Sequence, residues 1–305
     1  MQIIIFSYNR ALQLEALLFS IKKFWNNIDY HLDIIYNTSC DSYQSGYDLL
    51  KQKVNNFRGE VSFYKEQKNK FPQWTFKELT DIYNLKLLYL CPFLRHSKTT
   101  FRKQLLQVLK KSKSEQVMFL TDDSIFIKPI FLQPEDLKWI NEDPFHNQIS
   151  MRHGIETSGN KNHNYTNDRY HWDFSKYSSN DHYGYRFSLD AHIYHREAML
   201  KTLSSISFSN PNTLESSGML HTNKKRLFNN GMCFKNMSIL SFPINIVQTT
   251  FQNEALKASP DVLNKYFING YHLQYPQIKN FNTFQIYPDE VFLIKGKERV
   301  SLFIK

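Results

Sequence analysis

The chain has 305 residues, of which 41% are hydrophobic and 22% charged, a balance typical of a globular protein with one large domain or two small ones. Its formal net charge of +10 indicates a phosphorylated, polyanionic or anionic-membrane partner. Only 9 glycines occur, and the absence of both GxGxxG and GxxxxGKS/T excludes the usual glycine-rich dinucleotide and P-loop phosphate sites.

Strand-like and helix-like segments alternate through the first part of the chain. The β-branched run at 2–6 predicts a buried strand, and 11–24 carries apolar residues at three- and four-residue spacing, which predicts an amphipathic helix. Further strands are predicted at 31–37, 61–65 and 117–121, and further helices at 43–56, 75–90 and 98–111. This alternation favours a parallel sheet with right-handed crossovers, in which ligands bind beyond the carboxyl ends of the strands.

The second part of the chain is predicted to continue the sheet around a long loop. Residues 153–186 are polar and aromatic with almost no aliphatic side chains, so we interpret them as a loop over the ligand edge of the sheet. The other predicted elements are a helix at 134–140, a strand at 148–152, a strand within 186–195, a helix at 196–206, a helix near 260–268 and a terminal pair of strands at 290–295 and 299–305.

Two adjacent carboxylates, Asp122 and Asp123, follow the strand predicted at 117–121. This position puts them at the ligand edge of the sheet, and paired carboxylates on a loop suit Mg²⁺ or Mn²⁺. A divalent cation would also offset the repulsion between the two like charges. The alternative is an ordinary surface turn, since Asp and Ser favour turns.

Three features together resemble the GT-A nucleotide-sugar glycosyltransferases, especially the family 2-like bacterial enzymes. They are a first strand that ends in FSYNR (6–10), a second strand that ends in YN (36–37), and the acidic motif after the fourth strand. The resemblance covers residues 1–130 well and 185–220 loosely. It implies an α/β, Rossmann-like GT-A fold with a mostly parallel central sheet flanked by helices and with an acceptor-side half.

The resemblance also implies a division of the chain and a donor site. A single domain would contain a nucleotide-sugar-binding half at 1–130, an acceptor and catalytic half at 131–255 and a C-terminal extension at 256–305. In the family, the first strand and its turn hold the nucleoside, and an acidic DxD motif holds the metal and the diphosphate. The donor-binding residues implied here are Ser7, Tyr8, Asn9, Arg10, Asn37 and Asp122, and the ligands of a Mn²⁺ or Mg²⁺ cofactor are Asp123 and Asp122.

The acidic motif departs from the family pattern, which has an acid at its first and third positions. Thr121-Asp122-Asp123 and Asp122-Asp123-Ser124 each lack one of these two acids. Asp123 is the better metal ligand in the first register and Asp122 in the second. This departure predicts a weaker dependence on metal than is usual for the family.

In inverting members of the family, a carboxylate of the acceptor half removes the proton from the acceptor hydroxyl. Glu215 matches the family's spacing best and is predicted to be this base, with Asp190 as a second catalytic-site residue that binds the donor sugar or the acceptor. Alternatively, Glu215 is an acid in the first turn of a helix that interacts with the helix dipole. Asp190 is alternatively a turn residue at the end of a strand. The predicted acceptor-binding residues are Trp172, Asp173 and His192, with a solvated polar loop as the alternative.

The predicted function is hexosyl transfer with inversion, from a nucleotide-sugar donor to a glycan or lipid-linked acceptor, in polysaccharide biosynthesis. A nucleotidyltransferase of related topology is the first alternative, but FSYNRALQ (6–13) has no glycine for the phosphate loop of that class. A basic nucleic-acid-binding protein is the second alternative. No RNP-like or helix-turn-helix motif supports it, so no nucleic-acid partner is expected.

Three widely spaced cysteines without a CxxC pair favour a reducing cytoplasm. Met1 leads directly into a strand-like run without a charged leader, and no apolar run approaches the ~18 residues that a membrane span needs. We therefore expect a cytoplasmic protein, with peripheral contact to the inner face of a membrane as an option.

Overall fold

The computed structural model describes residues 1–25, 28–54, 57, 59–67, 100–157, 164–178, 181–245, 258–275, 285–286 and 290–303. The strands of its central sheet are β1 (Gln2–Tyr8), β2 (His31–Asn37), β3 (Val61–Lys65), β4 (Gln116–Thr121), β6 (Asn147–Ser150), β7 (Arg169–Asp173), β8 (His192–His195) and β9 (Asn230–Phe234). The helix expected at 75–90 lies outside the described residues. Within the described ranges, no helix is both long and apolar enough to cross a membrane.

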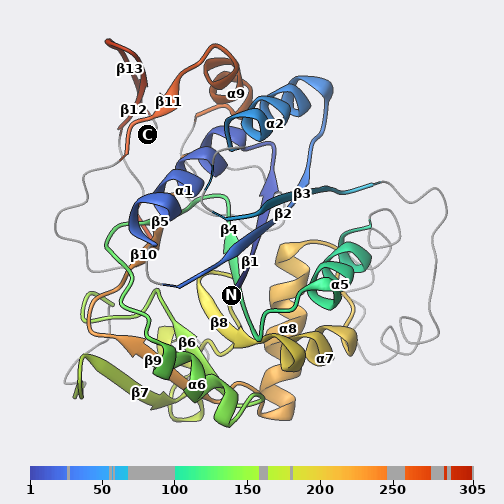
Figure 1. Cartoon of the computed structure of the whole chain (residues 1–305), viewed down its shortest axis with the longest axis vertical. Helices are drawn as coiled ribbons and strands as arrows, with labels where there is room; N and C mark the ends of the chain where they lie inside the picture. The colour runs from blue at the N-terminus through green and yellow to red at the C-terminus, as the bar shows by residue number, and fades with distance from the viewer. Residues whose placement is uncertain are drawn as a thin grey trace.

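The eight strands form one sheet in the order β3-β2-β1-β4-β8-β6-β9-β7 (Figure 1). β3, β2, β1 and β4 are parallel neighbours. β8 runs antiparallel to both β4 and β6, β9 is parallel to β6, and β7 is antiparallel to β9. Only β8 and β7 therefore oppose the other strands of this sheet. An α/β class with a mostly parallel central sheet flanked by helices is confirmed.

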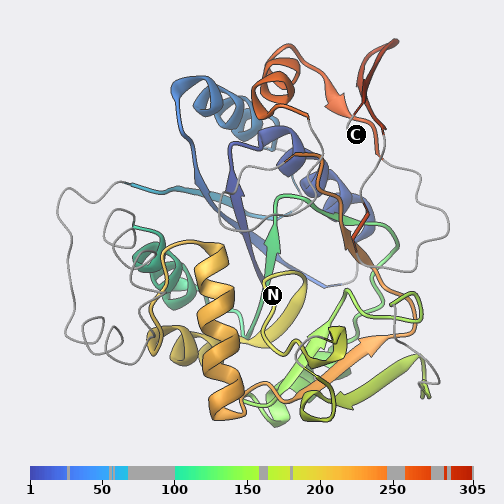
Figure 2. The same ribbon diagram turned by 180° about the vertical axis from the view of Figure 1, so that it is seen from behind.

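Helices cover both faces of the sheet (Figures 1 and 2). The first face carries α1 (Ala11–Phe24) and α2 (Asp41–Lys53), and the second carries α5 (Phe101–Lys111), α7 (Arg196–Ser204) and α8 (Pro211–Lys225). Alternate residues of β1 point to the two faces: Ile3 and Ile5 pack in the cluster of α1, whereas Ile4 and Phe6 pack in the cluster of α5 and α7. A strand that is buried on both faces needs a continuous apolar run, which explains QIIIF.

The remaining elements are shorter, and several of them pack in the apolar cluster of α1, on the first face of the sheet. β5 (Ser124–Phe126) pairs with β10 (Ile239–Ser241), and α6 (Pro134–Glu142) precedes β6. Near the C-terminus, α9 (Pro260–Ile268) packs on α1 and α2. β11 (His272–Leu273), β12 (Glu290–Lys295) and β13 (Glu298–Phe303) form an antiparallel sheet. The helix near 260–268 and the terminal strand pair are thus confirmed, and the division into halves stays a prediction.

Residues 153–186 contain regular structure, so the prediction of one long loop over the ligand edge is wrong. β7 forms the far edge strand of the central sheet, and two 3₁₀ turns follow it, η3 (Phe174–Lys176) and η4 (His182–Gly184). Trp172 packs with Phe174 and Tyr183 in a small aromatic cluster. Aromatic rings supply here the buried apolar area that aliphatic side chains supply elsewhere. Residues 158–163 and 179–180 lie outside the described residues.

A glycine sets the distance between α8 and the chain that leads into β8. A Cβ on Gly218 would lie 2.4–2.7 Å from the ring of Phe187, which is fully buried and has little room to move. α8 therefore approaches residues 187–189 closely only because residue 218 has no side chain.

Gly218→Ala tests this contact. Alanine normally stabilises a helix interior by about 1 kcal/mol relative to glycine, but overpacking of a core costs about 1–3 kcal/mol. We expect the clash to outweigh the propensity, with a net loss of about 1 kcal/mol or more in the free energy of unfolding, measured by urea denaturation. Ser217→Ala on the same helix is the control, with a change within about 0.5 kcal/mol. A Gly218→Ala variant as stable as the control would contradict the close contact.

Candidate active site

The carboxyl ends of β1, β2 and β4 bring together the polar residues that the sequence singled out for the donor. Tyr8 lies beside Asn37 in the parallel register of β1 and β2, and β4 pairs with the other side of β1. Asn9 continues β1 in a left-handed backbone conformation (φ 57°), which Asn tolerates better than most residues. Its side chain exchanges two hydrogen bonds of 2.9 Å with Ser39, so the turns after β1 and β2 are tied together.

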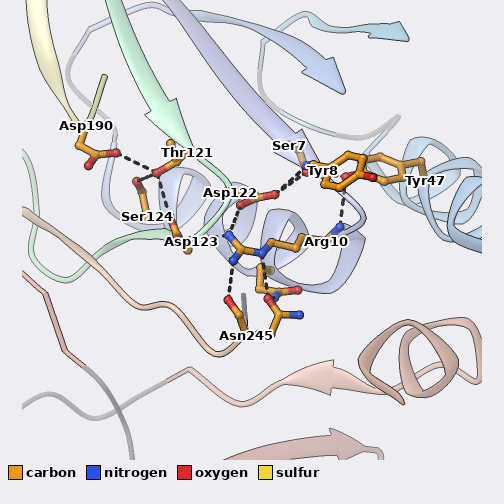
Figure 3. A network of polar contacts seen from close by, with 11 residues as sticks. Ser7, Tyr8, Arg10, Tyr47, Thr121, Asp122, Asp123, Ser124, Asp190 and Asn245 are labelled. Atoms are coloured by element: carbon orange, nitrogen blue, oxygen red, sulfur yellow. Dashed lines mark hydrogen bonds and ion pairs between the residues drawn. The ribbon is translucent and has the colours of Figure 1, made fainter. Parts of the chain in front are cut away.

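Asp122 is the centre of this edge, with only 4% of its surface exposed (Figure 3). One carboxylate oxygen accepts hydrogen bonds from Oγ of Ser7 (2.9 Å) and from the backbone N–H of Tyr8 (3.1 Å). The other accepts from Nη1 of Arg10 (3.0 Å). Burial raises the pKa of Asp122 to about 6, although the charge of Arg10 opposes this shift. Asp122 is therefore ionised at neutral pH, but the loss of a hydrogen-bond partner or of Arg10 would raise its pKa further.

Arg10 explains why two like charges stand side by side after β4. Its buried guanidinium places Nη1 3.0 Å from Asp122 and 3.3 Å from Asp123. Nε donates to Oδ1 of Asn245 (2.8 Å), and Nη2 donates to the backbone carbonyl of Asn245 (2.5 Å). Burial alone would lower the pKa of Arg10, but the two carboxylates raise it, so the guanidinium stays charged. The acidic pair is thus compensated by a side chain of the protein.

Tyr47 of α2 supports this cluster from the first face of the sheet. Its ring stacks on Tyr36 with a centroid distance of 4.4 Å, and its hydroxyl lies 2.5 Å from Oγ of Ser7. The backbone N–H of Arg10 donates to the same hydroxyl (3.3 Å). Because Ser7 donates to Asp122, Tyr47 must donate to Ser7. Burial raises the pKa of Tyr47, so the hydroxyl remains protonated and the chain of donors ends on the carboxylate.

A second chain of contacts links the acidic pair to Asp190. Oγ1 of Thr121 lies 2.8 Å from Oδ1 of Asp123 and 2.8 Å from Oδ1 of Asp190 (Figure 3). The other oxygen of Asp190 accepts from Nη1 of Arg152 (2.5 Å), which follows β6. Arg152 also donates to Oγ of Ser241 (3.2 Å). The structure therefore joins the residues predicted for the donor to a residue predicted for catalysis.

Glu215 of α8 lies next to the same turn. Its Oε1 accepts from the backbone N–H of Leu189 (3.2 Å), the residue before Asp190. Burial raises the pKa of Glu215 to about 7, and the negative charge of Asp190 contributes in the same direction. Tyr185 forms a hydrogen bond with this carboxylate. The two predicted catalytic acids are thus neighbours, and a carboxylate with a pKa near 7 suits a general base at neutral pH.

The three residues predicted to bind the acceptor are not brought to these carboxylates. His192 is 1% exposed and its Nδ1 lies 2.8 Å from Oε1 of Gln148, so it is a core residue that cannot touch an acceptor. Trp172 and Asp173 belong to β7, four strand spacings from β4, or roughly 19 Å across the sheet. Asp173 pairs with Asn230, the first residue of β9, which places it at the amino edge of the sheet rather than the carboxyl edge. The burial of His192 therefore speaks against its predicted role, whereas acceptor binding by Trp172 and Asp173 stays a prediction for a place away from these carboxylates.

Trp172 and Asp173 line a separate shallow hollow of about 430 Å³ between α6, β7 and β9. Its other lining residues are Trp139, Asn147, Tyr170, His171, Lys176, Tyr177, Asn230 and Gly231. Asp122, Asp123, Asp190 and Glu215 do not line it. We therefore do not assign the reaction to this hollow, although it has aromatic walls.

Three residues of the site were missed in the sequence. Arg152 is the last residue of the strand predicted at 148–152, and a charged side chain at a strand's carboxyl end is a usable signal. Tyr47 lies inside a helix, and Asn245 lies in an irregular segment far along the chain. Neither has a local pattern that distinguishes it, because their role depends on how α2 and the segment after β10 pack against β1.

Asp122 and Asp123 do not fit a divalent cation as they stand. Mg²⁺ and Mn²⁺ bind carboxylate oxygens directly, whereas Nη1 of Arg10 already lies between the two carboxylates, and the other oxygens of the pair lie within hydrogen-bond distance of Ser7, Tyr8 or Thr121. Within the described ranges, no group of three or more His, Cys, Asp or Glu side chains could hold a metal. The Mn²⁺ or Mg²⁺ cofactor stays a prediction for which these residues offer no ready ligand set, and no step below depends on it.

No protein-family model matches the chain, and no curated protein matches it in sequence. Among solved structures, it is similar to TarS 1-349 of S. aureus in complex with UDP, with 15% identity and a TM-score of 0.44 over 78% of this chain and 58% of that one. For a longer TarS structure the identity is 13% and the TM-score 0.41, covering 78% of this chain and 35% of that one.

The chain is also similar to the galactosyltransferase LgtC in complex with donor and acceptor sugar analogs, with 9% identity and a TM-score of 0.34 over 66% of this chain and 60% of that one. It thus spans less than two thirds of the length of each of these proteins. At these identities and scores the likeness concerns the outline of the fold, so the chemistry has to be inferred from the site residues themselves.

Tyr47→Phe tests the chain of donors that ends on Asp122. The variant keeps the ring stack but leaves the buried N–H of Arg10 without its acceptor, and an unsatisfied buried donor costs about 1–3 kcal/mol. We expect a loss of that size in the free energy of unfolding, measured by urea denaturation. Tyr36→Phe is the matched control, because among the described residues its hydroxyl contacts the partly exposed side chains of Gln44 and Lys51 rather than a buried backbone group. Equal losses of unfolding free energy in the two variants would show that the Tyr47 hydroxyl contributes no more to stability than the Tyr36 hydroxyl does.

Proposed function

We propose that this chain is a glycosyltransferase that moves a sugar from a nucleotide-sugar to a hydroxyl group of a glycan or lipid-linked acceptor. One observation carries the proposal. A compensated acidic cluster around Asp122 reaches Asp190 through Thr121, and Glu215, with its pKa near 7, accepts from the backbone N–H of Leu189 beside Asp190. A diphosphate-binding edge and a general base are the two parts that such a transfer needs.

The donor would lie across the carboxyl ends of β1, β2 and β4. Tyr8 has 39% of its surface exposed at the end of β1, so its ring is available to a nucleobase. Asn37, beside it at the end of β2, would lie near the base or the ribose. The diphosphate would lie toward Asp123 and Arg10, at the end of β4. This placement follows the rule that open α/β sheets bind ligands outside the carboxyl ends of their strands.

In the transfer step, the acceptor hydroxyl oxygen attacks the anomeric carbon of the donor sugar and its proton passes to Glu215. The bond between that carbon and the diphosphate oxygen breaks, and the nucleoside diphosphate leaves with the electron pair. One displacement inverts the configuration at the anomeric carbon. Asp190, oriented by Arg152, would hold a sugar hydroxyl between the two substrates.

Nucleotide binding tests the donor half. We expect UDP or GDP to bind with a Kd below a millimolar in calorimetry, and a ligand at 100 times its Kd stabilises a protein by about 2.7 kcal/mol, which a thermal shift detects. Tyr8→Ala should weaken binding by about tenfold or more, because stacking on a base is worth about 1–3 kcal/mol. Phe19→Ala, which also removes an exposed aromatic ring, is the control and should bind normally. If no nucleoside diphosphate binds at millimolar concentration, the proposal fails.

Glu215→Gln tests the general base. A positioned base is worth about 10²–10⁴ in rate, so kcat should fall by that range while the Kd of the donor is nearly unchanged. A base with a pKa of about 7 is protonated below that pH, so wild-type kcat should rise as pH increases through 7. The variant should lack this rise. Glu197→Gln, which neutralises an exposed acid at the start of α7, should keep both rate and profile.

Asp190→Asn distinguishes the roles of the two acids. If Asp190 binds a sugar hydroxyl, its loss should raise KM more than it lowers kcat. Normal turnover in Glu215→Gln together with no turnover in Asp190→Asn would mean that the two roles are reversed. Normal turnover in both variants would exclude an inverting transferase with a base at this edge.

A further inference from the structure

We infer that Arg10 and Arg152 compensate the acidic cluster in place of the divalent cation that DxD-type sites use, so that this protein binds its nucleoside diphosphate without a metal. The inference rests on the proposed function. It concerns how the negative charge at the carboxyl edge is balanced, and it departs from the expectation of a Mn²⁺ or Mg²⁺ cofactor.

Arg10 lies where a cation bridging the acidic pair would have to lie. Its Nη1 lies between the two carboxylates, 3.0 Å from Oδ1 of Asp122 and 3.3 Å from Oδ2 of Asp123. A divalent cation that bridged the pair would need the same space between the same two oxygens. Since a guanidinium is charged at every physiological pH, this compensation is permanent.

Hydrogen bonds to Asn245 hold Arg10 in this position. Asn245 accepts from Nε through its side chain and from Nη2 through its backbone carbonyl. Gln13 donates to the same side-chain oxygen of Asn245 (2.9 Å), and the backbone of Arg10 begins α1. Four hydrogen bonds of a guanidinium with 10% exposure would have to break before a metal could enter. A mobile surface arginine could swing aside, whereas this buried one is held by partners on Nε, Nη1 and Nη2.

Asp190 is the third carboxylate of the cluster, and it also has an arginine partner. Asp190 could complete a set of oxygen ligands with Asp123, but its free side is closed by Arg152 at 2.5 Å. Each of the six oxygens of Asp122, Asp123 and Asp190 therefore has a hydrogen-bonding group within 3.3 Å, with the hydroxyl of Thr121 shared between Asp123 and Asp190. Three carboxylates face two guanidinium groups, so most of the negative charge of the cluster is compensated by side chains of the protein.

The incomplete motif agrees with this arrangement. A metal-binding DxD motif needs acids at both ends, whereas Thr121 and Ser124 stand at the two candidate ends here. Their hydroxyl groups lie 3.3 Å apart and bond within the cluster. A chain that compensates its acids with arginine has no need of the missing carboxylate.

The test begins with the wild-type protein, with UDP and GDP as probes. Calorimetry in EDTA and in excess Mn²⁺ should give Kd values for the binding nucleotide that agree within about threefold. Mn²⁺ alone, followed by the loss of its free-ion paramagnetic resonance signal and by thermal shift, should show no saturable site on the wild-type chain. Mg²⁺ should give the same thermal result.

Arg10→Gln provides the converse measurement. Without the guanidinium, two adjacent carboxylates are uncompensated, so Mn²⁺ should now bind the variant and raise its melting temperature in a saturable way. The control is Arg196→Gln, which removes a partly buried arginine that donates to the backbone carbonyls of Ser114 and Leu109 at the opposite edge of the sheet. Mn²⁺ should have no effect on the control.

The outcomes separate the inference from the proposed function. Nucleotide affinity that falls more than about tenfold in EDTA would overturn the inference while leaving a metal-dependent transferase. Mn²⁺ that raises the melting temperature of the wild type as much as that of Arg10→Gln would also overturn it. No nucleotide binding in either buffer would reject the proposed function and the inference with it. If Arg10→Gln does not fold, the wild-type comparison of EDTA with Mn²⁺ still decides.

Discussion

The buried carboxylate of Asp122 is the constraint on which the rest of this site depends. A charge with 4% exposure is costly unless hydrogen bonds and an opposite charge compensate it. Asp122 finds its partners at the end of β1, in Ser7 and the amide of Tyr8, and at the start of α1, in Arg10. Tyr47 adds α2 to the same network. One carboxylate thus fixes the relative positions of four elements, so the geometry of the site and the stability of the fold have a common origin.

The antiparallel strand β8 extends this network into the second half of the chain. Because β8 runs against β4, the residues before its first position, rather than those after its last, lie at the carboxyl edge. Asp190 therefore meets Thr121, and Arg152 reaches the same place from the carboxyl end of β6, which runs parallel to β4. α8 then approaches this turn closely enough for Glu215 to bond the amide of Leu189. A reversed strand direction is what lets two distant parts of the sequence share one edge.

Much of this arrangement can be predicted from the sequence, because the strands of a parallel sheet are continuous apolar runs and polar residues at their ends must share an edge. Asp122 and Asp123 follow from that rule, whereas Asp190 is expected only from the resemblance to the family and reaches the edge because β8 is antiparallel. The pairing of Arg10 with the acids does not, since it depends on the segment around residue 245, which comes from far along the chain. β7 was missed because aromatic residues replace aliphatic ones in it. Histidine is a common site residue, yet the side chain of His192 points into the core. Only the register of β8 decides whether this side chain faces the site or the core, and the sequence does not give that register.

Thr121 has a single hydroxyl hydrogen, yet its oxygen is 2.8 Å from a carboxylate oxygen on each side. Only one of Asp123 and Asp190 can accept that hydrogen at a time, and the other contact is repulsive unless its carboxyl group carries a proton. A ligand that brings positive charge or a hydrogen-bond donor to one of these acids frees the hydroxyl to turn toward the other. Asp123 and Asp190 therefore compete for one hydrogen atom. If the nucleotide and the acceptor bind at these two acids as we propose, thermodynamic linkage makes each of them change the affinity of the other by the same factor.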